Sequence, residues 1–252
     1  MITGERVTTA SGGFNPTFQR HVAAYRLCAP LLPSGRVLDL GCGIGHSYRE
    51  LAPRVSVGVD LDPEVLVDQD RETVHADMRR LPFGGGSFAS VISVQSIEHV
   101  PDPESVLSEV RRVLEPGGRA VFVTPNRLTF GFGFGEEIID PYHYVEYDAQ
   151  QLHALCARFF SRVEVVGLHG SARYGELVAA ERRQLDRLLA LDPLRLRRLV
   201  PRRARQILYD WRLSRDRATA RPGAPEIVPE DFRLTSDGLG DALDLVAICD
   251  RD

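Results

Sequence analysis

Lysine is absent from this chain of 252 residues, and all 31 of its basic side chains are arginines. Without a lysine amine, Schiff-base chemistry, pyridoxal-phosphate chemistry and the P-loop phosphate site are excluded. The four cysteines, Cys28, Cys42, Cys156 and Cys249, are scattered and form no CxxC pair. This spacing indicates neither a disulfide framework nor a structural zinc site, so we expect reduced and mostly buried thiols.

Long apolar runs are also missing. No run approaches the roughly 20 residues that a membrane-spanning helix needs, and the first sixteen residues lack the layout of a signal peptide. We therefore expect a cytoplasmic protein that has no membrane partner. The apolar share of 43% and the charged share of 26% are typical of a globular chain. The net charge of −4 gives no reason to expect nucleic acid as a partner.

Short β-branched runs alternate with helical patterns along most of the chain. The predicted strands are Arg36–Leu40, Val55–Asp60, Thr73–Ala76, Ala89–Val94, Arg119–Thr124, Arg162–Leu168 and Leu243–Cys249. Helical patterns lie at Pro103–Leu114 and Asp148–Phe159, and a short one lies at Pro63–Asp70. Strands separated by helices predict βαβ units and an α/β fold with a doubly wound, largely parallel sheet covered on both faces.

The character of the sequence changes after residue 170. Residues 171–221 contain fourteen arginines interleaved with leucines at three- and four-residue spacing, which predicts amphipathic helices. Arginine is the only basic residue in the chain and acidic residues lie nearby, so this pattern favours a solvated helix face over a nucleic-acid site. We expect a helical insertion before the last strand.

The turn after the first predicted strand has glycine at alternate positions, Gly41, Gly43 and Gly45. Such glycines let the backbone approach a bound nucleoside closely. The dinucleotide fingerprint needs Gly or Ala three residues after its second glycine, and here that position is His46. The Asp39 carboxylate would also repel a pyrophosphate but suits an ammonium group. The turn favours S-adenosylmethionine (SAM) over NAD, with a plain tight turn as the alternative.

Two further carboxylates follow the next strands. Asp60 lies 21 positions after Asp39, the spacing at which an acidic residue meets ribose hydroxyls in this kind of sheet. An ionised carboxylate can accept from both hydroxyls of a vicinal diol. Leu61 would then lie against the adenine face, and Asp77 would accept from the adenine amino group. For Asp77 a surface turn remains the alternative.

Four motifs in order carry a family resemblance: VLDLGCGIG, GVDLDP, HADMRRLPF and FASVISVQSIEHVPDPESVLSEVRRVLEPGGRAVFVTPN. They resemble the core of class I SAM-dependent methyltransferases, in the ubiquinone-biosynthesis-like branch. The resemblance implies a Rossmann-like sheet of seven strands whose last strand is antiparallel, with SAM as cofactor and S-adenosylhomocysteine as product. The cofactor-binding residues that it and the turn suggest are Asp39, Gly41, Cys42 and Gly43 for the methionine part, Asp60 and Leu61 for the nucleoside, Asp77 and Met78 for adenine, and Gln95 for the sulfonium side.

A wider resemblance rests on TPNRLTF at 124–130, DPYHYVEY at 140–147 and the closing LDLVAI. These segments are similar to actinobacterial sugar O-methyltransferases, of the mycobacterial type that acts on methylmannose oligosaccharides. The resemblance implies methyl transfer to a hydroxyl of a small-molecule acceptor, a saccharide or a glycosylated metabolite. The helical insertion and the FGFGFGEEI loop are less similar, so we expect those regions to choose the acceptor.

Methyl transfer to a hydroxyl benefits from a base that removes the hydroxyl proton. His143 follows the fifth strand, and Glu146 is placed to orient its imidazole. The alternative is that His143 caps the helix near Asp148. His99, after the fourth strand, is a second catalytic candidate with a structural role as its alternative. A divalent cation at Asp140, His143 and Glu146 remains open, but we assign no metal ligand.

Arg20 and Tyr25 are predicted to lie on an N-terminal helix that crosses the cofactor cleft and excludes water. An ordinary amphipathic helix at the sheet edge is the alternative. The predicted organisation is an N-terminal cover at 1–35, a SAM-binding core at 36–170, a helical cap at 171–230 and a return to the core at 231–252.

Other functions remain open from the sequence. A C- or N-methyltransferase of a natural-product pathway needs no general base of this kind. A non-catalytic SAM-binding protein is a more distant alternative, and a dehydrogenase is disfavoured by His46 and Asp39. A homodimer also remains open.

Overall fold

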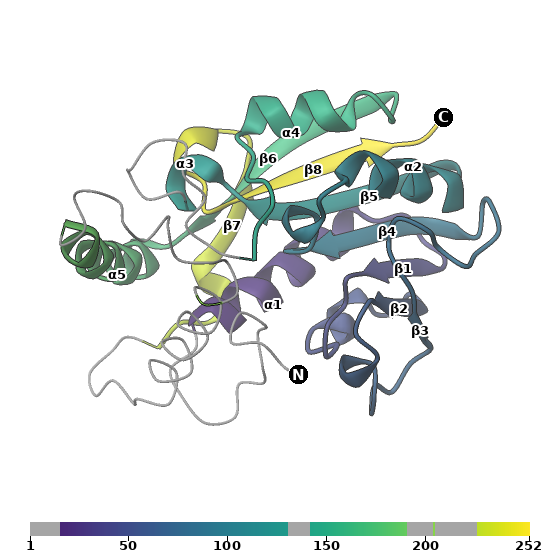
Figure 1. Cartoon of the computed structure of the whole chain (residues 1–252), viewed down its shortest axis with the longest axis horizontal. Helices are drawn as coiled ribbons and strands as arrows, with labels where there is room; N and C mark the ends of the chain where they lie inside the picture. The colour runs from purple at the N-terminus through teal and green to yellow at the C-terminus, as the bar shows by residue number, and fades with distance from the viewer. Residues whose placement is uncertain (1–15, 131–141, 191–203, 205–225) are drawn as a thin grey trace.

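The computed structural model describes residues 16–130, 142–190, 204 and 226–252, and its centre is one eight-stranded sheet with the order β3-β2-β1-β4-β5-β8-β6-β7 (Figure 1). The strands are β1 (Val37–Leu40), β2 (Ser56–Asp60), β3 (Thr73–His75), β4 (Phe88–Val94), β5 (Leu114–Pro125), β6 (Arg162–Gly170), β7 (Phe232–Thr235) and β8 (Asp244–Asp250). Strands β1 to β5 pair in parallel, whereas β8 is antiparallel to both β5 and β6. The predicted doubly wound sheet with an antiparallel last strand is confirmed.

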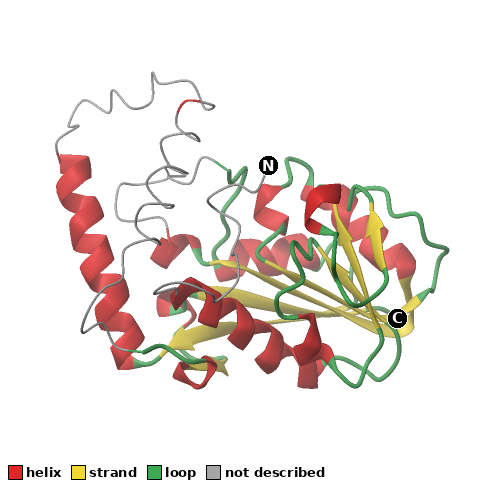
Figure 2. Ribbon diagram, turned by 90° about the horizontal axis from the view of Figure 1, so that it is seen from below, coloured by secondary structure: helices red, strands yellow, loops and turns green. Residues whose placement is uncertain are grey.

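Helices cover both faces of this sheet, as the alternating pattern predicts. The helices are α1 (Pro16–Cys28), α2 (Pro103–Val113), α3 (Arg127–Phe130), α4 (Ala149–Cys156) and α5 (Ala172–Ala190). Figures 1 and 2 show α1 on one face and α2 with α4 on the other, while α5 extends away from the end of β6. The sheet therefore lies between two helical layers, as in other doubly wound folds.

Side-chain alternation along the central strands decides what each face carries. In β1, Leu38 and Leu40 belong to the core beneath α2 and α4, whereas Val37 belongs to the core beneath α1. Successive side chains of a strand point to opposite faces. Asp39 therefore faces α1, and the sequence places a carboxylate inside the apolar layer below that helix.

The helix ends follow from local capping. The Asp102 side chain accepts from the backbone N–H of Ser105 and starts α2. Asp148 and Gln151 form a capping box at the start of α4, each side chain accepting from the other residue's backbone N–H. The alternative that His143 caps this helix is therefore wrong, because Asp148 fills that position.

Two details differ from the sequence-based expectation. The short helix expected at Pro63–Asp70 is reduced to a 3-10 turn, Pro63–Val65. The sheet has one strand more than the expected seven, because β7 pairs antiparallel with the outer edge of β6. Of the predicted cap at 171–230, the structure describes α5, residue 204 and the segment from residue 226 onward, and the Gly/Phe loop from residue 131 lies outside the described residues. The division into domains stays a prediction.

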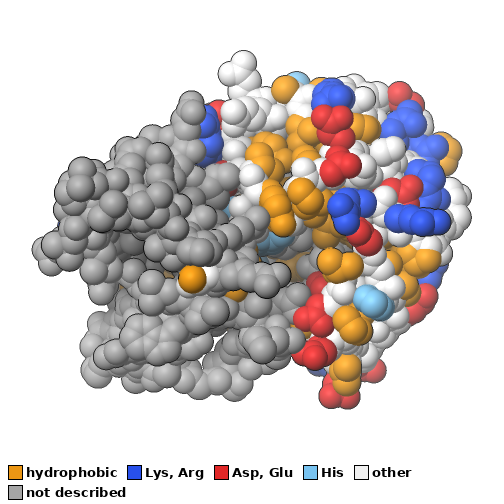
Figure 3. Space-filling view, viewed as in Figure 1, with side chains coloured by type: hydrophobic (Ala, Val, Ile, Leu, Met, Phe, Trp, Pro, Cys, Tyr) orange, Lys and Arg blue, Asp and Glu red, His pale blue; other side chains and the backbone are white. Residues whose placement is uncertain are grey.

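The described surface mixes charges of both signs. Figure 3 shows arginine and acidic side chains interspersed with apolar ones over the strand-rich half of that face. Among the helices of the described residues, none combines the length and the apolar character that crossing a bilayer requires.

Candidate active site

The predicted cofactor residues meet at one edge of the sheet. Since β1, β2 and β4 run in parallel, the residues that follow them, Gly41, Leu61 and Gln95, all emerge at the carboxyl edge. Ligands of open α/β sheets bind outside this edge.

The glycine turn after β1 is tight on one side and open on the other. Gly41 has a φ of 74°, and a Cβ added there would lie 2.6 Å from the Cβ of Ser96. Gly43 has a φ of 53°, and a Cβ there would meet no atom within 4 Å. Glycine is therefore required at Gly41 for the approach of the loop after β4, while the backbone at Gly43 borders open space. This open side fits a bound nucleoside.

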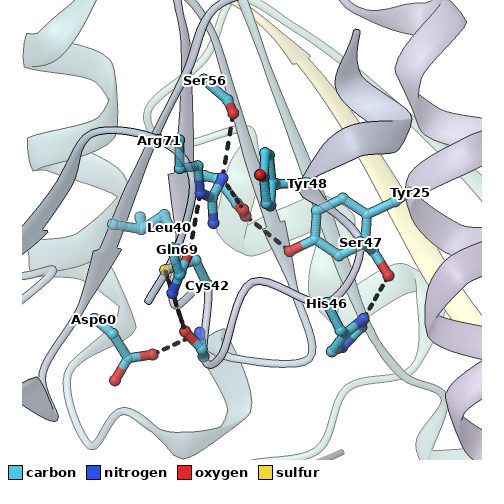
Figure 4. A network of polar contacts seen from close by, with 12 residues as sticks. Tyr25, Leu40, Cys42, His46, Ser47, Tyr48, Ser56, Asp60, Gln69 and Arg71 are labelled. Carbon is cyan, nitrogen blue, oxygen red and sulfur yellow. Dashed lines mark hydrogen bonds and ion pairs between the residues drawn. The ribbon is translucent and has the colours of Figure 1, made fainter. Parts of the chain in front are cut away.

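Asp39 is the centre of a buried polar network next to this turn. Figure 4 shows Tyr25 and Arg71, the partners of its carboxylate. The Tyr25 hydroxyl donates to Oδ1 at 2.7 Å, and Nη1 of Arg71 lies 2.7 Å from Oδ2. Burial raises the pKa of the Asp39 carboxyl, and the Arg71 charge and the Tyr25 hydrogen bond oppose that rise. The guanidinium of Arg71 also lies over the Tyr48 ring, 4.5 Å from its centre. Tyr25, expected at the cofactor cover, thus joins α1 to β1, and Arg71 is a partner that the sequence analysis missed.

Asp60 connects the end of β2 to the glycine turn. Its Oδ2 accepts from the backbone N–H of Gly43 at 2.9 Å, and its Oδ1 accepts from that of Asp62 at 3.0 Å. From the β2–β3 connection, the Gln69 side chain donates to the Gly43 carbonyl at 2.8 Å. Leu61 is 65% exposed beside this turn. The carboxylate and the exposed leucine stand where the ribose and adenine roles predict them, and those roles stay predictions.

The other predicted adenine-side residues differ in their surroundings. The Asp77 carboxylate accepts from the backbone N–H and the guanidinium of Arg79, which lowers the pKa of Asp77. Asp77 thus caps the turn after β3, and its adenine role stays a prediction. The Cε of Met78 reaches to 3.4 Å from a Cβ placed on Gly41, so this side chain lies at the glycine turn. Cys42 is buried, and burial raises the pKa of its thiol to about 12, which keeps it neutral.

His46, the residue that disfavours a dinucleotide, packs against α1. Its ring centre lies 5.2 Å from that of Phe18, 5.9 Å from that of His21 and 6.3 Å from that of Tyr25. Burial lowers the pKa of His46 to about 4, so the imidazole is neutral near pH 7. The glycine turn is thereby attached to the helix that the sequence analysis expects above the cofactor.

Arg20 and Gln95 meet at a carboxylate that the sequence analysis did not single out. Gln95 has a φ of 52°, and its side-chain amide donates to Oδ1 of Asp244 at 2.9 Å. Nε of Arg20 lies 3.4 Å from Oδ2 of the same carboxylate. Burial raises the pKa of Asp244, and the Arg20 charge opposes the rise. An acidic residue within the otherwise apolar segment Leu243–Cys249 is the signal that points to Asp244.

The predicted base and its partner are in contact. Nδ1 of His143 lies 3.0 Å from Oε1 of Glu146, and both side chains are buried. The rings of His143 and His99 are 4.9 Å apart between centres. The third member of the cation set considered from the sequence, Asp140, lies outside the described residues. The structure therefore brings all three predicted catalytic residues into one cluster.

Glu98 holds this cluster against the sheet. It is fully buried, and its Oε2 accepts from the Thr124 hydroxyl at 3.0 Å. Its backbone carbonyl accepts from the N–H of Tyr144 at 2.8 Å, which draws the segment that carries His143 toward the loop after β4. Burial raises the pKa of Glu98, and the charges of His99 and His143 oppose the rise.

A doubly wound sheet with strand order 3-2-1-4-5, an antiparallel strand inserted beside β5 and an open glycine turn after β1 defines the class I SAM-dependent methyltransferase fold. Residues 38–122 match the family model of a methyltransferase domain. Over 265 residues the chain is 31% identical to a probable SAM-dependent methyltransferase of Mycolicibacterium smegmatis, covering 99% of this chain and 95% of that protein. A second, from Mycobacterium tuberculosis, is 31% identical over 99% of this chain and 89% of its own length. The chain belongs to the SAM-dependent methyltransferases.

A solved structure supports the same fold. The chain is similar to a SAM-dependent methyltransferase of Thermotoga maritima, described as a possible histamine N-methyltransferase, with a TM-score of 0.61. The two share 18% identity over 93% of this chain and 91% of the other. At this level of identity the likeness speaks for the fold, while the acceptor must be inferred from the site.

Proposed function

We propose that this methyltransferase acts on a hydroxyl of a small-molecule acceptor, a saccharide or a glycosylated metabolite. The observation that carries the proposal is the buried pair of His143 and Glu146 at the carboxyl edge of the sheet. Bound SAM supplies a methyl group activated on a sulfonium. A hydroxyl is a weak nucleophile that gains from a positioned base, whereas an amine or an activated carbon depends on one less. The resemblance to sugar O-methyltransferases favours a saccharide.

His143 takes the hydroxyl proton in this mechanism. Its Nδ1 lies against Glu146 at 3.0 Å, so Nε2 is the atom that accepts the proton as the acceptor oxygen gains the methyl group. The negative charge of Glu146 holds the ring in one tautomer and stabilises the imidazolium that forms. His99, whose ring packs on that of His143, orients the acceptor beside it.

The chain's own contacts also support the cover role of α1. Tyr25 is fixed to Asp39 and Arg20 to Asp244, so two polar contacts join α1 to strands at the carboxyl edge. A helix held in this way keeps water from the reacting groups. In this proposal α1 covers the cofactor side of the site.

The test compares His143→Ala with Glu146→Gln and with His153→Ala, an exposed histidine on α4 as the control. Titration calorimetry measures SAM binding, and a methyl-transfer assay uses a panel of mono- and oligosaccharides together with amine and carbon acceptors. We expect His143→Ala to lower kcat on a sugar hydroxyl by about 100- to 10,000-fold and to leave SAM binding unchanged. Glu146→Gln is expected to lower kcat by a smaller factor than His143→Ala.

Three other results contradict the proposal. Methylation of amines or carbon with no transfer to hydroxyls points to the C- or N-methyltransferase. Tight SAM binding without turnover on any acceptor points to a non-catalytic binding protein. Full activity of His143→Ala on a hydroxyl removes His143 as the base.

A further inference from the structure

Two histidines and a buried carboxylate converge beside the proposed catalytic pair. Glu98, His99 and His143 each offer one ligand atom, and these atoms all lie within 4.8 Å of one another. Glu98 and His99 follow β4, whereas His143 comes from the segment before α4, so two loops distant in sequence supply the group. Imidazole and carboxylate ligands from separate loops are the usual composition of a protein metal site.

Nδ1 of both His99 and His143 already has a polar partner. Nδ1 of His143 lies 3.0 Å from Oε1 of Glu146, and Nδ1 of His99 lies 3.4 Å from the carbonyl oxygen of Tyr142. Metal-binding histidines usually donate the other ring N–H to a carboxylate or a backbone carbonyl in this manner. Both contacts favour the tautomer that carries its proton on Nδ1, and so make Nε2 the ligand atom of each ring.

Glu98 supplies an independent observation. Its Oε2 accepts from the Thr124 hydroxyl, but Oε1 is buried and has no hydrogen-bond partner in the part of the chain that the structure describes. Nε2 of His99 lies 4.0 Å from this Oε1. A buried polar atom without a partner costs about 1–3 kcal/mol, and more when it is charged. A cation bound between Oε1 and the two imidazoles removes that cost.

We propose that Glu98, His99 and His143 form a binding site for a divalent first-row transition-metal ion such as Zn²⁺ or Mn²⁺. Two imidazoles argue against Mg²⁺ and Ca²⁺, which prefer oxygen ligands. Three protein ligands leave at least one position for the oxygen of an acceptor hydroxyl. Ligand atoms around a tetrahedral ion at about 2.1 Å lie roughly 3.4 Å apart, so side-chain shifts of about 1 Å close the site.

The ion site does not depend on the proposed function, but its consequence for the reaction does. An acceptor hydroxyl bound to the ion has a lowered pKa. With the ion on its Nε2, His143 can no longer take the proton as in the ion-free mechanism given under the proposed function. The hydroxyl then loses its proton to solvent water, and the ion replaces the imidazole as the activating group. Glu146 then acts as a positioning residue that orients His143 toward the ion.

Calorimetric titration of the chelator-treated full chain with Zn²⁺ tests the site, with electron paramagnetic resonance of added Mn²⁺ as a second readout. We expect one ion per chain. His99→Ala and His143→Ala should weaken binding at least about 100-fold, and Glu146→Gln about 10-fold, the range typical of a residue that orients a ligand. His153→Ala, which removes an exposed histidine from α4, should bind like the wild type.

Glu98→Gln keeps the shape of the side chain and the contact with Thr124, and circular dichroism checks that each variant is folded. Should this buried variant fail to fold, His99→Ala carries the test, because the His99 side chain is partly exposed. The inference is overturned when the wild type binds no ion at stoichiometric concentration, or when His99→Ala and His143→Ala bind it unchanged. Methyl transfer to hydroxyls without an ion overturns only the role of the ion in the reaction. Ion binding with the expected variant pattern but without transfer to any hydroxyl supports the site and overturns only the proposed function.

Discussion

The two halves of the carboxyl edge neutralise their carboxylates with different partners. On the cofactor side, Asp39 pairs with Arg71 and Asp244 pairs with Arg20. A guanidinium stays charged at every physiological pH. On the proposed acceptor side, Glu146 contacts the imidazole of His143. Unlike a guanidinium, a neutral imidazole has a ring lone pair that can take a proton or a metal ion. In the proposed site, the cofactor side therefore carries fixed charge, and the acceptor side carries a group suited to proton transfer or metal binding.

The largest effect is expected when Arg71 is removed from the buried ion pair of the cofactor side. Arg71→Met leaves the Asp39 carboxylate buried with Tyr25 as its remaining partner. Removing one partner of a buried ion pair costs about 3–5 kcal/mol, so we expect the free energy of unfolding in urea to fall by that amount. The double variant with Asp39→Asn should recover much of the loss.

A double-mutant cycle on an exposed ion pair provides the control for the one on Arg71 and Asp39. Arg36 and Glu72 also form an ion pair, at 2.8 Å, but their side chains are 39% and 55% exposed. For Arg36→Met with Glu72→Gln we expect a coupling below about 1 kcal/mol. Equal coupling in the two cycles would contradict the idea that the cofactor side depends on buried fixed charge.

The cofactor side is also the half that its sequence describes best. Asp39, Gly41 and Gly43 are close together in the chain, at alternate positions, and a strand followed by a glycine turn fixes their geometry locally. Asp60 follows because neighbouring parallel strands end at the same edge. Arg71 was missed because nothing local distinguishes it among 31 arginines. Its role arises from packing between the β2–β3 connection and β1.

On the acceptor side, the sequence predicts contacts between residues close in the chain, but not the complete cluster that includes the buried Glu98. His143 and Glu146 are three positions apart, so their contact is a local property. The burial of Glu98 depends instead on the neighbouring strand β5, which contributes Thr124. The missed strand β7 has the same cause, since its hydrogen bonds come from β6. Its four residues alternate between apolar and polar, but so short a run does not stand out in the sequence.

A sharper test of the cofactor side is Asp60→Asn. The carboxylate holds the Gly43 N–H at 2.9 Å and is predicted to accept from the ribose hydroxyls. Hydrogen bonds to a charged group contribute about 1.5–3 kcal/mol each, so we expect S-adenosylhomocysteine to bind about 100-fold more weakly by calorimetry. Asp62→Asn is the control, because an asparagine keeps the cap over Glu64 and binding should stay within about 2-fold. Comparable losses in both variants would show that Asp60 acts through the turn alone.

The smallest expected effect concerns the neutral imidazole that attaches the glycine turn to α1. The pKa of His46 is lowered to about 4 in the folded chain by burial, against about 6.5 in an unfolded one. The unfolded chain therefore binds the proton more readily, and the stability that the neutral ring provides is present above pH 6.5 and is lost as the pH falls toward 4. Between pH 7 and pH 5 this amounts to about 1–2 kcal/mol. Urea unfolding at the two pH values should show that His46→Gln loses less stability on acidification than the wild type by this amount, whereas His153→Gln follows the wild type. If His46→Gln loses as much stability on acidification as the wild type, the ring is accessible to protons in the folded chain and α1 does not seal this side of the turn.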